Sequence, residues 1–345
     1  MFRKKSLFVF LPLILIPVIY LLGPRPNLGN VDDKTEKPTV QIAELDSFIA
    51  HSESKVSDIK TNNESTIFWA DSLHKSKTEY CLLYIHGFSA SIGEGDPVHR
   101  DFASRYGMNL YVPRLYEHGR KDVDAFKNFS ADQYFESAQQ AYEIAKTMGE
   151  KVIVMSCSSG STLSIMLART NPEIHSFIMY SPNIDIKDPT SALVTGPWGR
   201  QLLSVVMKGD YNYIKYIPEA RKYWYEKYHV DGIIALKGML EKYMTPDNFK
   251  LIHQPLYMGY YYVDDEHQDQ VVSVPHMLDF YDRISTPKDK KKKKSFTTAK
   301  GHVICSAIMN PNVKDVELET YRFAEEVLKL IPVSDKSSIN QGSNK

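Results

Sequence analysis

The organisation of this chain can be worked out from nine residues, Val152-Ile153-Val154-Met155-Ser156-Cys157-Ser158-Ser159-Gly160. The first four are apolar and mostly β-branched, which predicts a short buried strand. A helical pattern follows from Ser159 to Thr170. Small residues therefore connect a strand directly to a helix through a sharp turn, which is typical of an α/β protein.

Ser158 is the candidate nucleophile in this turn. A nucleophile elbow usually has the pattern G-x-S-x-G, because the residues two before and two after the serine must be small. Gly160 fits this pattern, and Ser156 replaces the first glycine with another small residue. The following helix would present its positive N-terminal end to Ser158, which favours developing negative charge. A serine-rich turn without chemistry is the alternative.

Cys157 is the neighbouring rival, because a cysteine is intrinsically the better nucleophile. Its neighbours at two residues are Met155 and Ser159, which do not fit the pattern of the elbow. We therefore expect Cys157 to be a packed thiol.

Strand-like and helix-like segments alternate on both sides of the elbow. Short apolar strands that alternate with helices predict a mainly parallel sheet with helices on both faces. The predicted strands are Ser65–Trp69, Tyr80–Ile85, Asn109–Val112, Lys151–Met155, Phe177–Tyr180, Leu256–Val263 and Phe296–Thr298. The predicted helices are His99–Tyr106, Ala131–Met148, Ser159–Thr170, Pro275–Arg283 and Val316–Leu330. The alternation stops from about 188 to 250, a helical stretch rich in tyrosine, and the lysine run Lys290–Lys294 is expected to be a solvated loop.

Composition narrows the possible functions. Lys+Arg and Asp+Glu both number 42, so the formal net charge of zero gives no indication of a nucleic-acid partner. The 3 cysteines are odd in number and far apart, which argues against a disulfide framework or a zinc site. No glycine-rich dinucleotide motif follows the first strand. We therefore expect neither a cofactor nor a metal.

The N-terminus has the sequence pattern of a membrane anchor or a signal segment. Arg3, Lys4 and Lys5 precede an apolar run from Leu7 to Leu22, and no small-residue cleavage site follows. We expect residues 1–24 to be an uncleaved anchor, with the catalytic domain extracytoplasmic on the periplasmic side. Secretion after signal cleavage is the alternative. Residues 25–60 are expected to be a polar linker with one short helix, 61–333 the folded domain, and 334–345 a disordered tail.

A His-Gly pair supplies the candidate oxyanion hole. His86 and Gly87 follow the strand Tyr80–Ile85, upstream of the serine. The backbone N–H of Phe88 would be one oxyanion donor, and the N–H of Ser159 the other. His86 itself is expected to be structural.

The base and the acid are sought on loops after the last two strands. Gly301-His302 follows the last strand, where a loop can carry the imidazole to the serine. Asp269 is the preferred acid because Val271-Val272 follow it, while Asp264 and Asp265 of the same loop stay open as alternatives. A metal bound by these carboxylates and His267 lacks any defined ligand spacing. The order Ser158, Asp269, His302 is the order of α/β-hydrolases.

The segment from about Thr66 to Ile308 resembles the monoacylglycerol lipase and carboxylesterase-like branch of the α/β-hydrolases. The resemblance is carried by the elbow, by Asp269 and Gly301-His302, and by two further motifs, His86-Gly87-Phe88-Ser89-Ala90-Ser91 and Pro113-Arg114-Leu115 with His118-Gly119. It implies an eight-stranded, mainly parallel sheet with a helical cap inserted after strand 6, at about 187–250. The glycine that the family usually has at position 156 is absent.

These features predict an esterase or lipase that cleaves carboxylic esters through an acyl-enzyme. The tyrosine-rich stretch favours an apolar or amphiphilic ester, although the same side chains could simply pack the cap onto the sheet. A serine peptidase or amidase would use the same triad. A membrane-tethered binding protein on this fold is the non-enzymatic alternative, and Ser156 is the feature that favours it.

Overall fold

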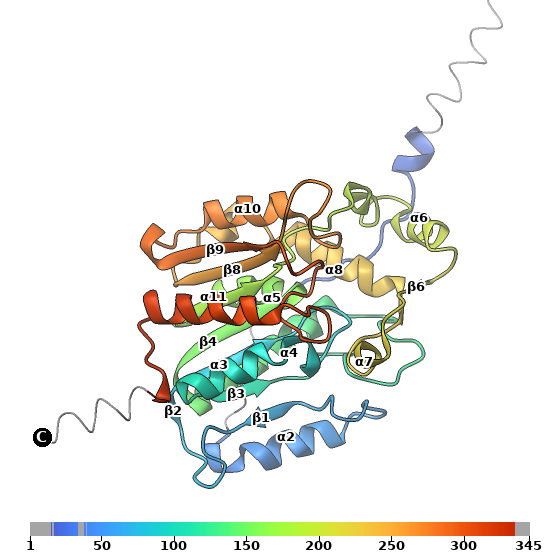
Figure 1. Cartoon of the computed structure of the whole chain (residues 1–345). Coiled ribbons are helices and arrows are strands. Elements are labelled where there is room, and N and C mark those ends of the chain that lie inside the picture. The colour runs from blue at the N-terminus through green and yellow to red at the C-terminus, as the bar shows by residue number, and fades with distance from the viewer. Residues whose placement is uncertain (1–14, 16, 34–37, 39, 335–345) are drawn as a thin grey trace, which may run out of the picture.

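A mainly parallel sheet forms the centre of the protein (Figure 1). The structure is a computed structural model, and it describes residue 15, residues 17–33, residue 38 and residues 40–334. Six strands of the sheet are parallel, and the first is antiparallel to its neighbour. In spatial order they are β1 (Thr66–Phe68), β3 (Asn109–Val112), β2 (Thr78–Ile85), β4 (Gly149–Cys157), β5 (Ser176–Tyr180), β8 (Leu256–Tyr261) and β9 (Lys291–Phe296).

The expected α/β architecture is confirmed, whereas the expected count of eight strands is not. The main sheet has seven strands in the part of the chain that the structure describes. The described chain before β1 adds no strand to the sheet, because it forms the 3-10 turn η1 (Ile42–Glu44) and the helix α2 (Leu45–Ser54).

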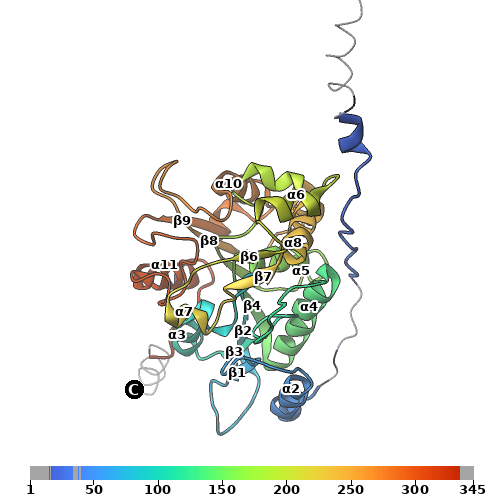
Figure 2. The ribbon, with the colours of Figure 1, turned by 90° about the vertical axis from the view of Figure 1, so that its right-hand side faces the viewer.

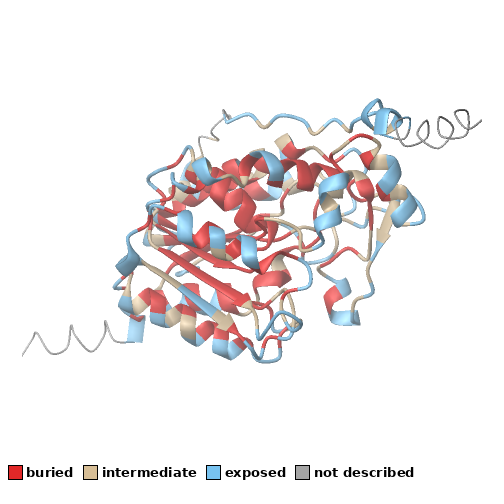
Figure 3. Ribbon diagram, turned by 90° about the horizontal axis from the view of Figure 1, so that it is seen from above, coloured by how far each residue is buried: buried red, intermediate tan, exposed pale blue. Residues whose placement is uncertain are grey.

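Helices cover both faces of the sheet, so alternate side chains of each central strand enter different cores. On β2, Leu83 and Ile85 join the core that contains side chains of α4 (Ala131–Met148), α5 (Ser159–Ala168) and α10 (Val274–Arg283). Leu82 and Tyr84 join the core under α3 (Val98–Tyr106) and α11 (Val313–Glu326). Figure 3 shows the resulting buried central strands between helices with exposed outer faces.

The helix in the expected linker is part of the fold. Leu45 and Ile49 of α2 are buried in the first core. Glu53 near the end of α2 pairs with Arg114 at 2.7 Å. The described part of the N-terminal run is helical at residues 17–21, but most of the run and the tail 335–345 lie outside the described residues. Among the residues described, no helix is long and apolar enough to cross a membrane.

Most of the lysine run is a strand, so the loop expected at Lys290–Lys294 is wrong. The last strand, expected near Phe296–Thr298, is present but begins at Lys291 and ends at Phe296. After the short turn η4 (Lys288–Lys290), β9 pairs with β8 alone and forms an edge of the sheet. Edge strands tolerate charge, because one side of the strand faces water. The ammonium groups of Lys291 and Lys293 lie 4.8 and 4.6 Å from the ring centre of Tyr281 on α10. Lysine stems can therefore cover the sheet edge while their charges stay in solvent.

A long insertion separates β5 from β8, at the point where the alternation stops in the sequence. It contains helices, as expected, and also a two-stranded antiparallel sheet that the sequence did not indicate. Its elements are η3 (Pro189–Leu193), α6 (Gly199–Val206), β6 (Tyr211–Tyr213), α7 (Pro218–Arg221), β7 (Lys227–His229), α8 (Val230–Tyr243) and α9 (Pro246–Phe249). Figure 2 shows α6, α7, β6 and β7 together in front of the sheet.

Candidate active site

Ser158 occupies a strained turn between β4 and α5. Its backbone has φ 54° and ψ −124°, a conformation that residues with a side chain rarely adopt. The strain is held by neighbouring backbone: the N–H of Ser158 donates to the carbonyl of Tyr180 (3.0 Å), and its carbonyl accepts from Asn183 (3.1 Å). The strand-to-helix turn expected from the sequence is therefore present, and Ser158 is the one residue between the end of β4 and the start of α5.

The two small residues around Ser158 are small for different reasons. A Cβ at Gly160 would lie 2.1 Å from the carbonyl oxygen of Ile85, so no side chain fits there. Ser156, by contrast, is accommodated: its buried hydroxyl lies 3.0 Å from the hydroxyl of Ser161 on α5. The departure from the usual glycine is thus compensated by a hydrogen bond between the strand and the helix.

Asp269 and His302 form a close pair. The Nδ1 atom of His302 lies 2.6 Å from Oδ2 of the fully buried Asp269. The other carboxylate oxygen accepts from the N–H groups of Val271 (2.8 Å) and Val272 (3.1 Å). Burial acts to raise the pKa of Asp269, but the charge and hydrogen bond of His302 and the two amides together lower that pKa below its ordinary value.

The contact with Asp269 also makes His302 more basic. Burial alone would lower the pKa of the imidazole, but the Asp269 carboxylate outweighs it, and the pKa of His302 is raised. Asp264, in contrast, is exposed and bonds to His267 within its own loop, with 2.9 Å to the ring Nδ1. Of the three aspartates considered, the structure brings only Asp269 to His302.

The loop of His302 is attached beside the elbow. Ser181, next to the residue whose carbonyl accepts from Ser158, donates its hydroxyl to the carbonyl of His302 (2.7 Å). The Nε2 atom of His302 is buried and has no hydrogen-bond partner among the described residues. The hydrogen bond from the Ser158 hydroxyl to His302 is therefore not formed here. Catalytic hydrogen bonds are often long or unformed in an enzyme without substrate.

The His-Gly pair follows β2, the strand next to β4. Gly87 approaches the nucleophile closely, since a Cβ there would lie 3.0 Å from Cβ of Ser158. Neither candidate oxyanion donor, the N–H of Phe88 or that of Ser159, is engaged in a hydrogen bond within the described chain. His86 is buried, which lowers the pKa of its imidazole to about 4, and its Nε2 accepts from the N–H of Leu115 (3.3 Å). His86 thus has the structural environment expected of it.

Cys157 is a packed thiol in this structure. It is fully buried in the core under α3 and α11. Its interaction with the thiol of Cys305, together with burial, raises the pKa of Cys157 well above its ordinary value. A thiol held in its protonated form is a poor nucleophile. The described residues also contain no cluster of three or more histidine, cysteine or acidic side chains that could hold a metal ion.

The insertion lies directly against the oxyanion loop. The N–H of Tyr225 donates to the carbonyl of Ser89 (2.9 Å), and the hydroxyl of Ser91 donates to the carbonyl of Tyr223 (3.0 Å). Trp224 is buried against Ala90 and is part of a small cluster that also includes Val303 from the loop of His302. Aromatic residues of the insertion therefore pack on both loops that carry the candidate catalytic groups.

Sequence reasoning missed Glu94, a buried carboxyl group at the same place. It lies in the 3-10 turn η2 (Ile92–Gly95), and its Oε2 accepts from the N–H of Gly87 at 2.6 Å. The available signal was the triplet Gly93-Glu94-Gly95, in which small neighbours allow an acidic residue to be enclosed.

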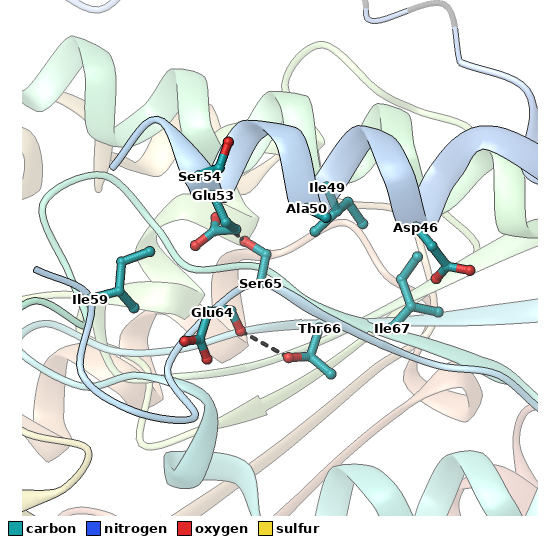
Figure 4. Close-up of a pocket in the computed structure, with 10 residues that line it drawn as sticks. All are labelled: Asp46, Ile49, Ala50, Glu53, Ser54, Ile59, Glu64, Ser65, Thr66 and Ile67. Atoms are coloured by element: carbon teal, nitrogen blue, oxygen red, sulfur yellow. Dashed lines mark hydrogen bonds between the residues drawn. The ribbon is translucent and has the colours of Figure 1, made fainter. Parts of the chain in front are cut away.

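A separate cavity of about 580 Å³ lies between α2 and β1 (Figure 4). Ile49, Glu53 and Ile67 are among its lining residues, and none of Ser158, Asp269 and His302 is. It does not belong to the candidate active site.

No model of a known protein family matches this chain, and no curated protein matches it. Solved structures do match. One described as LipS and LipT, two metagenome-derived lipolytic enzymes, has a TM-score of 0.61 at 14% identity, over 77% of this chain and 98% of that one. A soluble variant of monoglyceride lipase from Saccharomyces cerevisiae has a TM-score of 0.50 at 13% identity, over 75% and 91%. The enol-lactonase of Burkholderia xenovorans has 0.50 at 10% identity, over 76% and 96%.

The chain has the α/β-hydrolase fold. These neighbours share it over nearly their whole length, and their identities of 10% to 14% make the likeness one of architecture. Within this fold, the elbow, the His-Gly loop and the Asp269–His302 pair lie in the segments that follow parallel strands of the sheet.

Proposed function

We propose that this α/β-hydrolase cleaves carboxylic esters with Ser158 as nucleophile, His302 as base and Asp269 as the acid that orients the base. The observation that carries the proposal is the 2.6 Å contact between His302 and Asp269, two residues from different loops, together with the strained elbow geometry of Ser158. An orienting carboxylate on a histidine near an activated serine is the arrangement of nucleophilic acyl transfer.

The proposed mechanism has two steps. His302 takes the proton of the Ser158 hydroxyl as the oxygen attacks the ester carbonyl, and the oxyanion accepts from the free N–H groups of Phe88 and Ser159. His302 then protonates the leaving alcohol. In the second step His302 activates water, which releases the acyl group and regenerates Ser158. Substrate binding would close the hydrogen bond between Nε2 of His302 and Ser158 that is open here.

Fluorophosphonate labelling tests this proposal directly. We expect the folded wild-type protein to be labelled and Ser158→Ala not to be. Absence of labelling in folded wild type would remove the proposed function, and labelling that survives in Ser158→Ala would remove the assignment of the nucleophile. Ser161→Ala is a matched control, because Ser161 is a buried serine of α5 whose hydroxyl, within the described part of the chain, hydrogen-bonds to Ser156 alone.

The substrate class follows from the neighbours and from the insertion. The neighbours are described as lipolytic enzymes, a monoglyceride lipase and an enol-lactonase, so we propose an apolar or amphiphilic ester. Trp224 and Tyr225 are buried in packing against the oxyanion loop, so the less buried Tyr216 and Tyr223 are better placed to contact a substrate. Parallel assays of p-nitrophenyl esters and aminoacyl p-nitroanilides separate an esterase from a peptidase of the same fold.

We also propose that the N-terminal run attaches the protein to a membrane, with the catalytic domain on the extracytoplasmic side. The proposal rests on the basic residues that precede the apolar run Leu7–Leu22. Expression of the full chain followed by membrane fractionation tests it. We expect the protein in the membrane pellet after a carbonate wash. Recovery of a shortened chain in the soluble fraction would instead show signal cleavage.

A further inference from the structure

Glu94 is a buried acid with no role in the mechanism above. The residue is 1% exposed, and its Oε2 accepts from the N–H of Gly87 (2.6 Å) and the hydroxyl of Tyr84 (3.1 Å). The other oxygen, Oε1, lies 2.7 Å from the place where a Cβ of Gly87 would be, and that place is 3.0 Å from Cβ of Ser158. The carboxyl group therefore lies against Gly87 of the oxyanion loop, and Gly87 in turn lies against the nucleophile.

No lysine or arginine within the described chain forms an ion pair with Glu94. Its hydrogen-bond donors are one amide and one phenol. A carboxylate that is removed from water without a cation is costly, so burial favours the protonated acid. The pKa of Glu94 is accordingly raised by burial to about 7, against the lowering effect of its hydrogen bonds and of His302.

The groups around Glu94 cannot easily supply a stable counter-charge. All of those that interact with it electrostatically are neutral or anionic, apart from His302 when it is protonated. They come from β2, α4, β4, the insertion and the loop after β9, and they are Tyr84, Tyr134, Cys157, Tyr216 and His302, while the thiol of Cys305 contacts the main-chain carbonyl of Glu94.

We propose that Glu94 is a positioning residue for the oxyanion hole and that it acts as a neutral carboxylic acid. By accepting from Gly87, its carboxyl group fixes the peptide that leads to Phe88, the proposed oxyanion donor. This inference rests on the proposed function. It adds a residue outside the triad whose protonation state controls the charge beside Ser158.

Neutrality matters because the oxyanion is itself negative. An ionised Glu94 would place a second negative charge in the same enclosed space, where electrostatic interactions are strong. It would also raise the pKa of His302, because a negative charge at Glu94 acts in that direction. Both effects narrow the pH range of activity, the first at its alkaline side and the second at its acid side.

Two substitutions separate the hydrogen bond from the charge. Glu94→Gln keeps an acceptor for Gly87 and cannot ionise, so we expect kcat for p-nitrophenyl acetate at neutral pH within about threefold of wild type. Glu94→Ala leaves the Gly87 amide without its acceptor, and we expect kcat to fall by about 100-fold with a much smaller change in KM. Thermal unfolding and circular dichroism establish that each variant is folded.

The pH profile is the measurement that a purely structural role would not change. We expect kcat/KM of wild type to decline above about pH 7, and the Glu94→Gln profile to be broader on both sides between about pH 5 and pH 9. Glu317→Gln is the matched control, because Glu317 is also buried but pairs with Lys314 on α11, away from the site. Its profile should superimpose on that of wild type.

Each other outcome overturns the proposal. Wild-type kcat in folded Glu94→Ala would show that Glu94 positions nothing. A Glu94→Gln enzyme as slow as Glu94→Ala would show that an ionised Glu94 is needed. A Glu94→Gln enzyme that keeps the wild-type profile would show that the protonation state of Glu94 does not control the site. If Glu94→Ala does not fold, the pH profile of kcat/KM for Glu94→Gln alone tests the proposal. Fluorophosphonate labelling of wild type is read separately, so failure of the esterase proposal is distinguishable from failure of this one.

Discussion

Two buried carboxyl groups lie in loops around the candidate nucleophile, and their pKa values are shifted in opposite directions. Asp269, in the loop after β8, has a histidine at 2.6 Å and two backbone donors, and its pKa is lowered in spite of burial. Glu94, in the loop after β2, has one backbone donor and a phenol, and burial raises its pKa to about 7. Burial alone therefore does not set the charge of an acid, because the partners on each oxygen decide it.

The largest expected effect on activity comes from replacing Asp269, the ionised one of these two acids. Asp269→Asn should lower kcat by about 10⁴-fold, because an amide favours the wrong tautomer of His302 and cannot stabilise its protonated form. The remaining activity should have its acid limb at lower pH, since Asp269 is what raises the pKa of His302. Ester hydrolysis measured across pH checks both. A loss below about tenfold would contradict the assignment of Asp269.

The contributions of Asp269 and Glu94 to the free energy of unfolding should change with pH in opposite directions. A lowered pKa stabilises the fold above the unfolded value, so the stability that Asp269 contributes is lost as pH falls below about 3.8. A raised pKa does the reverse, so the contribution of Glu94 is lost as pH rises from about 4.5 to about 7.

Urea unfolding of wild type against Asp269→Asn and against Glu94→Gln measures these contributions. We expect the two differences in the free energy of unfolding to change with pH in opposite directions. Differences that move in the same direction would mean that folding shifts both pKa values in the same direction.

The sequence predicted the charged acid and missed the neutral one. Asp269 was recognisable because a Val-Val step follows it in the loop after a predicted strand. Glu94 follows no motif, and its burial depends on a 3-10 turn that places its carboxyl group on the amide of Gly87, a tertiary contact that no spacing encodes. The elbow was predictable for the opposite reason, since Gly160 and the β-branched strand are local requirements.

The fold divides in the same way. The central strands were predictable because both of their faces are buried and their residues are continuously apolar. The edge strand β9 was not, because four of its six residues, Lys291–Lys294, are lysines, and a run of charged residues is not the apolar pattern expected of a strand. Strands β6 and β7 of the insertion have three residues each, too few for an alternating pattern to be recognised.

A smaller effect is expected when the donor from Tyr84 to Glu94 is removed. The Tyr84 hydroxyl donates at 3.1 Å, and this hydrogen bond lowers the pKa of Glu94. Tyr84→Phe should therefore raise that pKa and move the alkaline limb of kcat/KM upward by less than about one pH unit, with kcat at neutral pH within about threefold of wild type. An alkaline limb that moves to lower pH would contradict the identification of Glu94 as the group that titrates there.

The smallest effect is expected at Asp264, an acid in the same loop as Asp269. Its carboxylate is exposed, and hydrogen bonds from the N–H and ring of His267 lower its pKa without any contact to His302. Asp264→Asn should leave kcat/KM within about twofold of wild type, because a solvent-exposed charge contributes little to a buried site. The same assay applied to Asp269→Asn provides the contrast. If Asp264→Asn were the slower of the two, the loop would have to rearrange in the working enzyme and the acid would be Asp264, since only one carboxylate can occupy Nδ1 of His302.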